Sequence, residues 1–179
     1  MKKKEFNIKG FVFTIALIVI VFCISIILTK YFDKKKIDKI YNNNEIVKGK
    51  IVETGYRKIN FVIAEYYYKN IRYTVEQSVH SNSVKEGEYF KVYLNMNNPQ
   101  QSFIAYDEPF FEENQKVTFT DGRVETILER NLIRFSYTIE GKNYLRFQKV
   151  KSTLDIKVGN IYKLQYLIDT PTIAIIYIQ

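Results

Sequence analysis

The sequence predicts a mainly β protein, with one N-terminal transmembrane helix followed by two tandem small antiparallel β-barrel or sandwich repeats. An uncharged apolar run near the start indicates the helix. Short segments rich in Val, Ile, Tyr and Phe, separated by Gly, Asn and Pro, indicate the strands. Two halves of the β region follow one order, which indicates the repeat. The expected domains are an anchor with a juxtamembrane helix (1–44), a first β repeat (45–106), a linker (107–116) and a second β repeat (117–179).

The apolar run covers residues 11–28, in which only Thr14 and Ser25 are polar and none is charged. As an α-helix it would be about 27 Å long, close to the roughly 30 Å hydrocarbon core of a bilayer. A helix satisfies its own backbone polar groups in lipid. The run therefore predicts an uncleaved membrane span; a cleaved signal peptide and a buried core helix are the alternatives. The span includes Phe11, Leu17, Phe22 and Leu28.

The net charge of +8 is concentrated beside this run. Residues 1–44 hold nine Lys and three acids, whereas the rest of the chain holds 18 basic and 16 acidic residues. Anionic lipid headgroups attract such a cluster by about 1 kcal/mol for each nearby Lys on the cytoplasmic side. The candidate headgroup contacts are Lys30, Lys34, Lys35 and Lys36.

Lys residues lie on both sides of the span, so the positive-inside rule gives nearly a tie for its orientation. A short N-terminal tail before a single span commonly stays inside. The sequence therefore predicts a single-pass membrane protein with its β region outside the cytoplasm. Cysteine usage does not bear on this, since no cysteine follows Cys23.

The internal repeat becomes visible when the β region is shifted by 72 positions. Val52-Glu53-Thr54 then falls on Val124-Glu125-Thr126, and the turn residue Gly87 falls on Gly159. Their common order and spacing favour a duplication over coincidence. Further matches are Lys85 with Lys157, Lys91 with Lys163 and Pro99 with Pro171, and, with a slip of one residue, Tyr66 with Tyr137 and Tyr73 with Tyr144.

The residue pattern of each copy predicts five strands. Along the central strands, apolar and polar residues alternate between the two faces. Lys69-Asn70 and Glu140-Gly141 offer the positive φ that a tight hairpin needs. The expected strands are 46–54, 60–69, 71–77, 89–96 and 102–106, then 117–129, 132–140, 142–149, 161–168 and 172–178. The expected inward residues include Phe90, Val92, Leu94 and Met96, Ile133, Phe135, Tyr137 and Ile139, and Tyr162, Leu164, Tyr166 and Ile168.

The segment between the copies is acidic and contains Pro109, so it reads as a solvated linker. The alternative is a strap whose Phe110 and Phe111 pack onto one of the barrels.

The order of these turn and core motifs resembles a bacterial membrane-associated module, the domain of unknown function 3592, in two tandem copies. The second copy has Thr170 where the usual Asn-Pro pair has Asn, and Leu94 to Met96 departs from the customary Y-x-P approach. The resemblance implies a small β-barrel beside a membrane, with no established chemistry. Its motifs are Gly49-Lys50-Ile51, Tyr66-Tyr67-Tyr68, Asn70 to Tyr73, Gly87 to Tyr93, Asn98-Pro99 and Ile104, then Gly122-Arg123-Val124, Tyr137, Gly141 to Tyr144, Gly159 to Tyr166 and Thr170-Pro171.

Residue types for catalysis or metal binding are scarce. His80 is the one histidine and is expected in an exposed polar loop, and no cysteine lies outside the apolar run. A nucleophile–base pair or a zinc site built on His and Cys is therefore not expected, nor is a cofactor. The acids Asp107, Glu108, Glu112 and Glu113 cluster, but adjacent acids in a linker are usually solvated charge.

Three tyrosines on nominally outward strand faces, Tyr67, Tyr89 and Tyr93, form a candidate protein-contact face. Nucleic-acid binding would require a clear positive excess, which the near-neutral β region lacks. The sequence thus predicts a binding or structural module at the membrane of a bacterial cell envelope, with lipid and a protein or envelope component as partners. The alternative is a membrane-located inhibitor or immunity-type protein that neutralises a toxin or enzyme; a hydrolase using acids alone is a third class.

Overall fold

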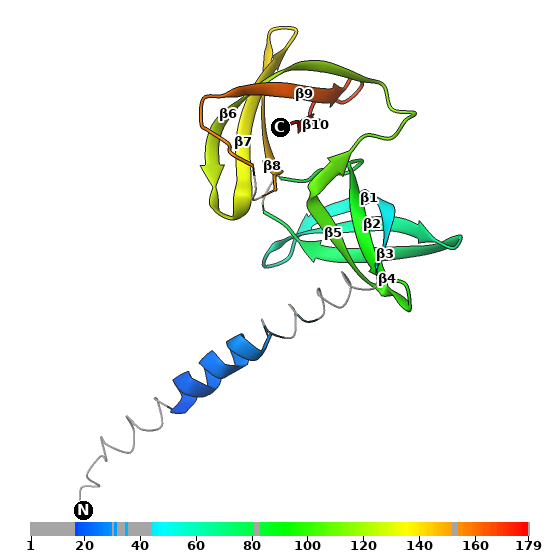
Figure 1. Ribbon diagram of the computed structural model, residues 1–179, viewed down its shortest axis with the longest axis vertical. Helices are drawn as coiled ribbons and strands as arrows, with labels where there is room; N and C mark the ends of the chain where they lie inside the picture. Colours follow the sequence, from blue (N-terminus) through cyan, green and yellow to red (C-terminus); the bar gives the residue numbers. More distant parts are fainter. Residues whose placement is uncertain are drawn as a thin grey trace, which may run out of the picture. The chain divides into compact units, whose positions relative to one another are not determined.

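The computed structural model describes residues 17–29, 31, 35, 44–80, 83–151 and 154–178. The chain divides into two compact units, Met1–Asn42 and Asn43–Gln179. Within the first unit, residues 17–29 form an α-helix, and the second unit contains all ten strands named below (Figure 1).

The second unit contains two five-stranded antiparallel sheets, which confirms a mainly β protein with two sheets. A short 3-10 turn, η1 (Glu129–Asn131), joins two strands of the second sheet. The first sheet consists of β1 (Asn44–Tyr56), β2 (Asn60–Tyr68), β3 (Ile71–Ser78), β4 (Tyr89–Asn95) and β5 (Asn98–Phe110). The second consists of β6 (Val117–Leu128), β7 (Leu132–Ile139), β8 (Lys142–Lys149), β9 (Ile161–Leu167) and β10 (Ala174–Ile176).

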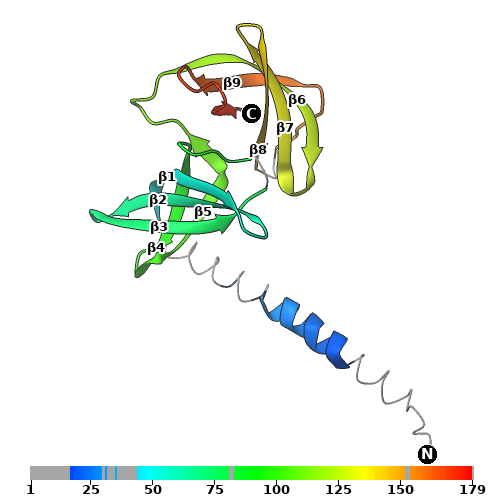
Figure 2. The ribbon, with the colours of Figure 1, turned by 180° about the vertical axis from the view of Figure 1, so that it is seen from behind.

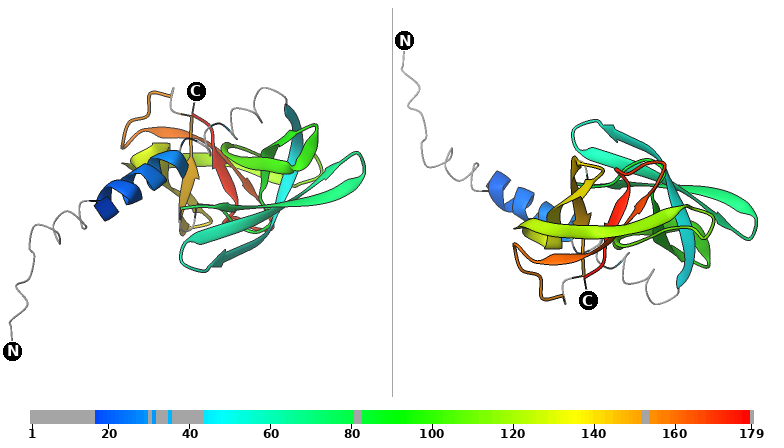
Figure 3. Two further views of the ribbon diagram at one scale, coloured as in Figure 1. Left: turned by 90° about the horizontal axis from the view of Figure 1, so that it is seen from below. Right: turned by 90° about the horizontal axis from the view of Figure 1, so that it is seen from above.

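The two sheets share one topology. Their strand orders are β3-β2-β1-β4-β5 and β8-β7-β6-β9-β10, so the first strand of each set lies in the centre. Both sheets curl strongly, as views from other directions show (Figures 2 and 3). In the first sheet the edge strands β3 and β5 contact each other, and in the second β8 and β10 do. The sets β1 to β5 and β6 to β10 are called the first and second repeat below.

Equivalent bulges fix how the repeats align. The pairing of β1 with β2 shifts between Ile51 and Glu53, and that of β6 with β7 shifts between Val124 and Thr126. The extra residue of each bulge directly follows Ile51 and Val124, so Ile51, rather than Val52, is the counterpart of Val124. The backbone agrees, because Gly87 and Gly159 donate to the carbonyls of Ile51 and Val124. The expected offset of 72 is therefore wrong by one residue in this strand.

The hairpin turns form at the predicted residues. Lys69 and Asn70 have φ of 49° and 63°, and Glu140 and Gly141 have φ of 50° and 76°. Two successive left-handed residues match the twist of the flanking strands, which is why such two-residue loops connect β2 to β3 and β7 to β8.

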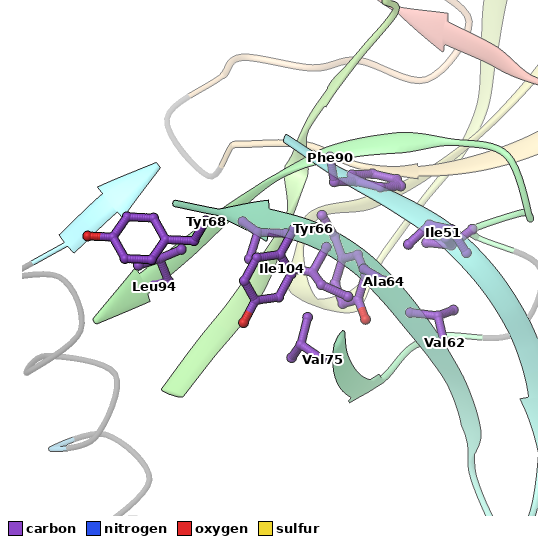
Figure 4. Packing of buried hydrophobic residues seen from close by; sticks show 12 residues of the cluster. Ile51, Val62, Ala64, Tyr66, Tyr68, Val75, Phe90, Leu94 and Ile104 are labelled. Atoms are coloured by element: carbon purple, nitrogen blue, oxygen red, sulfur yellow. The ribbon is translucent and has the colours of Figure 1, made fainter. Parts of the chain in front are cut away.

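The inner side of each sheet is filled by side chains. Tyr66 and Ile104 of the first repeat are 1% and 2% exposed, and they pack among the residues shown in Figure 4. Val124, Phe135 and Leu164 of the second repeat are each 0% exposed. Alternation along the strands places these residues on one face, as the sequence predicts.

Three details differ from the expectations. Met96 and Ile168 do not continue the inward pattern, because their strands have ended and their side chains are 43% and 51% exposed. Strand β5 runs to Phe110, so the expected linker begins inside this strand. Phe110 pairs with Tyr89 of β4 and its ring lies 5.9 Å from that of Tyr89, which fits the strap better than a solvated linker.

The described helix is apolar on every side. Leu17, Phe22 and Leu28 are 52%, 66% and 48% exposed, and their apolar neighbours are similarly exposed. Among the residues that the structure describes, no helix is both long and apolar enough to span a bilayer. Lys35 is helical and exposed, whereas Phe11, Lys30, Lys34 and Lys36 lie outside the described residues.

Candidate functional site

The outer side of the first repeat carries a row of aromatic side chains. Tyr89 and Tyr93 lie on β4, on the face opposite the buried Phe90, Val92 and Leu94. Tyr93 stacks on Phe103 of β5 with ring centroids 5.1 Å apart and planes 7° apart. Tyr89 contacts Phe110 farther along the same pair of strands. We call these four residues the outer aromatic row; it consists of Tyr89, Tyr93, Phe103 and Phe110.

Tyr67, the third tyrosine predicted for this surface, lies outside the row. It is on β2, its side chain is 59% exposed, and it pairs with Arg72 of β3. Strand β1 lies between β2 and β4. The structure therefore brings Tyr89 and Tyr93 together and places Tyr67 two strands away on the same sheet.

Strand β1 contributes basic side chains next to the row. Lys48 pairs in register with Lys91 and Lys50 with Tyr89. The ammonium groups of Lys48 and Lys50 each lie 5.9 Å from a ring centroid, of Phe110 and Tyr89 respectively. These distances are near the limit of a cation–π contact, so each adds little.

Glutamates neutralise most of this positive charge. The Lys91 ammonium lies 2.6 Å from a carboxylate oxygen of Glu108, and the Tyr93 hydroxyl donates to the other oxygen at 3.0 Å. Partial burial raises the pKa of Glu108, but the hydrogen bonds from Lys91 and Tyr93 outweigh it and lower that pKa below its ordinary value. Lys48 pairs with Glu112 at 3.1 Å. The surface is thus aromatic and close to neutral.

Sequence reasoning did not place Phe103, Phe110, Lys48 or Glu108 in this surface. The pairing of β4 with β5 brings Phe103 and Phe110 beside Tyr93 and Tyr89. The alternation of β5 could have suggested Phe103, since Phe103 and Ile104 are neighbours and point to opposite faces. The sequence predicts solvated acids in the expected linker, whereas Glu108 lies in β5 and forms an ion pair with Lys91.

A second cluster joins the two repeats. Glu88, just before β4, forms an ion pair with Arg146 of β8, and both side chains are 4% exposed. Arg146 also donates from Nη1 to the carbonyl of Thr172 at 2.8 Å, and the Lys85 amide donates to Glu88 at 3.1 Å. Burial raises the pKa of Glu88, while the Arg146 charge acts in the opposite direction.

A shallow groove of about 270 Å³ lies between the end of β5 and the segments around β8 and β10. Its walls are largely apolar and include Val150, Leu154 and Ile178, with Asp107 and Lys151 as the charged members. The groove therefore offers apolar contact area with few polar groups to orient a ligand.

The remaining chemical candidates are dispersed. His80 is exposed, as predicted, and its ring lies 5.8 Å from that of Phe147. Within the described ranges no group of three or more His, Cys, Asp or Glu residues is arranged to hold a metal ion.

Comparison of the chain with protein-family models, with curated proteins and with solved structures gives no match. The resemblance to domain of unknown function 3592 therefore stays a prediction.

Proposed function

We propose that this protein is a membrane-tethered binding module that recognises a protein of the cell envelope through the outer aromatic row. The observation that carries the proposal is the stacking of Tyr93 on Phe103 outside a sheet whose inner side is already filled. Since side chains fill the inner side of the sheet, we expect the partner to bind at the outer side. Aromatic side chains are enriched in protein interfaces because they bury a large area while a tyrosine hydroxyl stays wet.

The character of the surface favours a protein over a polyanion. Lys48 and Lys91 are paired with Glu112 and Glu108, so little net positive charge is left for phosphate groups. A nucleic-acid surface requires unpaired Lys and Arg, because binding is driven by release of counterions from phosphates. A near-neutral aromatic surface instead matches an apolar, uncharged patch on a partner.

The apolar helix supports the tether. A helix that is apolar on all sides is stable inside a protein core or a bilayer, not in water. In residues 17–29 the polar Thr29 satisfies its hydroxyl within the helix by donating to the Ser25 carbonyl at 2.9 Å. Internal satisfaction of polar groups is what a lipid environment requires.

A photo-crosslinking experiment tests the binding surface. A photoreactive phenylalanine analogue replaces Tyr89 in the full-length protein in intact cells; in a matched control it replaces Ile161, the exposed β9 counterpart of Tyr89. We expect one discrete protein adduct from position 89 and none from position 161. The adduct should weaken when Tyr93→Ser is added. No adduct, or the same adduct from both positions, contradicts the proposal.

The side of the membrane is tested separately. Asn114 is exposed in the connection between the repeats, so Asn114→Cys in a Cys23→Ser background provides a single accessible thiol. We expect labelling by a membrane-impermeant maleimide in intact cells. Labelling only after the cells are opened would place the β region in the cytoplasm.

A further inference from the structure

The ion pair between Glu88 and Arg146 joins the two repeats and is the most deeply buried ion pair among the described residues. Both side chains are 4% exposed, whereas Lys91, Lys48 and Lys163, which form other ion pairs, have side chains that are 46%, 64% and 74% exposed. The Nε of Arg146 has no hydrogen-bond partner among the described residues, so Glu88 and the Thr172 carbonyl carry the recognition of the guanidinium.

Each partner of this pair differs from its counterpart in the other repeat. Val75 pairs with Ala64 in the first repeat, and Arg146 pairs with Phe135 in the second, at equivalent positions of the two sheets. Val75 belongs to the core of the first repeat. Likewise the carbonyl oxygens of Glu88 and Asn160 accept hydrogen bonds from the amides of Ile51 and Val124, so Asn160 is the counterpart of Glu88. Glu88 and Arg146 therefore each occur in one repeat only, at the contact between the two repeats, and do not belong to the pattern that the repeats share.

Apolar and aromatic contacts also lie near the pair. A methyl group added at Gly87 would lie 3.6 Å from Ile173, and the rings of His80 and Phe147 are 5.8 Å apart. Contacts of this kind are not directional, so they allow two surfaces to slide. A buried ion pair does not allow the surfaces to slide, because a shift of one repeat against the other leaves both charges desolvated and unpaired.

We propose that the Glu88–Arg146 pair is an orientation latch, which holds the two repeats in one fixed arrangement so that they move as a single rigid body. The latch places complementary charges at only one relative position of the repeats. Buried polar pairs fix register in the same way in coiled coils, where a single polar contact selects one alignment among several. The latch does not depend on the binding role of the outer aromatic row.

Distances between spin labels test the latch. Labels on Lys58→Cys and Lys142→Cys, both exposed and in different repeats, are measured in full-length protein in detergent with Cys23→Ser. The test variant, Glu88→Asn with Arg146→Val, gives each repeat the residue of the other. We expect one narrow distance peak in the parent and a broad distribution in the variant, with unchanged far-ultraviolet circular dichroism.

The control removes an ion pair of the same charge type that lies within one repeat. Asp121→Asn with Lys163→Val breaks an exposed pair in the second repeat and should keep the narrow peak. A narrow peak in Glu88→Asn with Arg146→Val overturns the latch. If that variant does not fold, Glu88→Gln replaces it, since the amide keeps the size and removes the charge. The same broadening is expected there, and an unchanged narrow peak again overturns the proposal.

Discussion

Gln148 has the same role in the second repeat that Gln77 has in the first. Gln148 donates to the Ile176 carbonyl at 3.1 Å and accepts from the Ile176 amide at 3.0 Å. Gln77 makes the same two bonds with Ile104, at 3.1 and 2.8 Å. A side-chain amide offers one donor and one acceptor side by side, as a strand does. Each glutamine therefore joins the two edge strands of its curled sheet and satisfies backbone groups that would otherwise be unpaired.

Replacing either glutamine by leucine should destabilise the protein. The change leaves an amide and a carbonyl of Ile176 or Ile104 without partners, and each unsatisfied buried group costs about 1–3 kcal/mol. Gln148→Leu should cost more than Gln77→Leu, because Gln148 is buried and Gln77 is half-buried. Urea unfolding followed by tyrosine fluorescence measures the difference. Thr74→Leu, an exposed position of β3, is the control, and equal stability of all three variants would refute the bridging role.

Alkaline pH should weaken the second repeat through Tyr137. Burial raises its pKa to about 12, and the hydroxyl donates to the Pro171 carbonyl at 2.6 Å. An unfolded tyrosine ionises near pH 10. Because the folded pKa is the higher one, the stabilisation is complete below pH 10 and is lost as the pH rises to about 12, at about 1.4 kcal/mol per unit. Urea unfolding at pH 9, 10 and 11 should show this fall, and Tyr137→Phe should make it shallower, while Tyr66, Tyr106 and Tyr177, whose pKa values burial also raises, keep part of it. An equal pH dependence in the variant would contradict the assignment.

Glycines Gly49 and Gly122 occupy equivalent central positions but have unequal room. A methyl group at Gly49 would overlap Cγ2 of Val92, whereas one at Gly122 would lie 3.0 Å from Leu164 and 3.1 Å from Ile176, at the ends of flexible side chains. Overpacking of a core typically costs about 1–3 kcal/mol. Gly49→Ala should fall in that range and Gly122→Ala below it. Thermal unfolding compares them, and a larger loss in Gly122→Ala would show that the central strands are spaced differently.

Substitutions of Glu88 and Arg146 should have non-additive effects on the free energy of unfolding. Arg146→Val alone leaves Glu88 buried without its partner, and breaking a buried pair typically costs about 3–5 kcal/mol. Adding Glu88→Asn removes the stranded charge, so the double variant should recover part of that loss. A double-mutant cycle from urea unfolding measures the coupling. Simple addition of the two single losses would mean that the charges do not interact.

Local sequence patterns predicted the strands and turns well, because alternation and hairpin residues act over a few positions. The strand expected at 132–140 is observed as β7 (Leu132–Ile139), and the turn at Lys69-Asn70 has the required positive φ. The spacing of Met96 continues that of Leu94 and predicts an inward side chain, but the turn to β5 ends the strand before Met96. The match of Val52 with Val124 is wrong by one residue, because the β1–β2 hairpin has one more residue pair beyond its bulge than the β6–β7 hairpin, so no single offset aligns every strand.

Contacts between distant segments were not predictable in the same way. Glu88, just before β4, and Arg146 of β8 lie in different repeats, and they meet only where the two repeats pack together. The one available signal was a charged residue at a position where the other repeat has Val75. Similarly, the outer aromatic row depends on the pairing of Tyr93 with Phe103, which follows from sheet order rather than from either strand alone.

The apolar helix gives the most direct test of the tether. Ile20 and Ile24 are 54% and 50% exposed in the described helix, and Ile20 lies near the middle of the predicted span. An aspartate at the centre of a span costs about 2.5–3.5 kcal/mol on insertion scales. Ile20→Asp with Ile24→Asp should therefore release the full-length protein from membranes in an alkaline carbonate wash, while the parent stays in the pellet. Thr29→Asp, at the end of the helix, should behave like the parent because a terminal charge can reach the headgroups. A parent protein that is itself washed off would leave the helix without a role as an anchor.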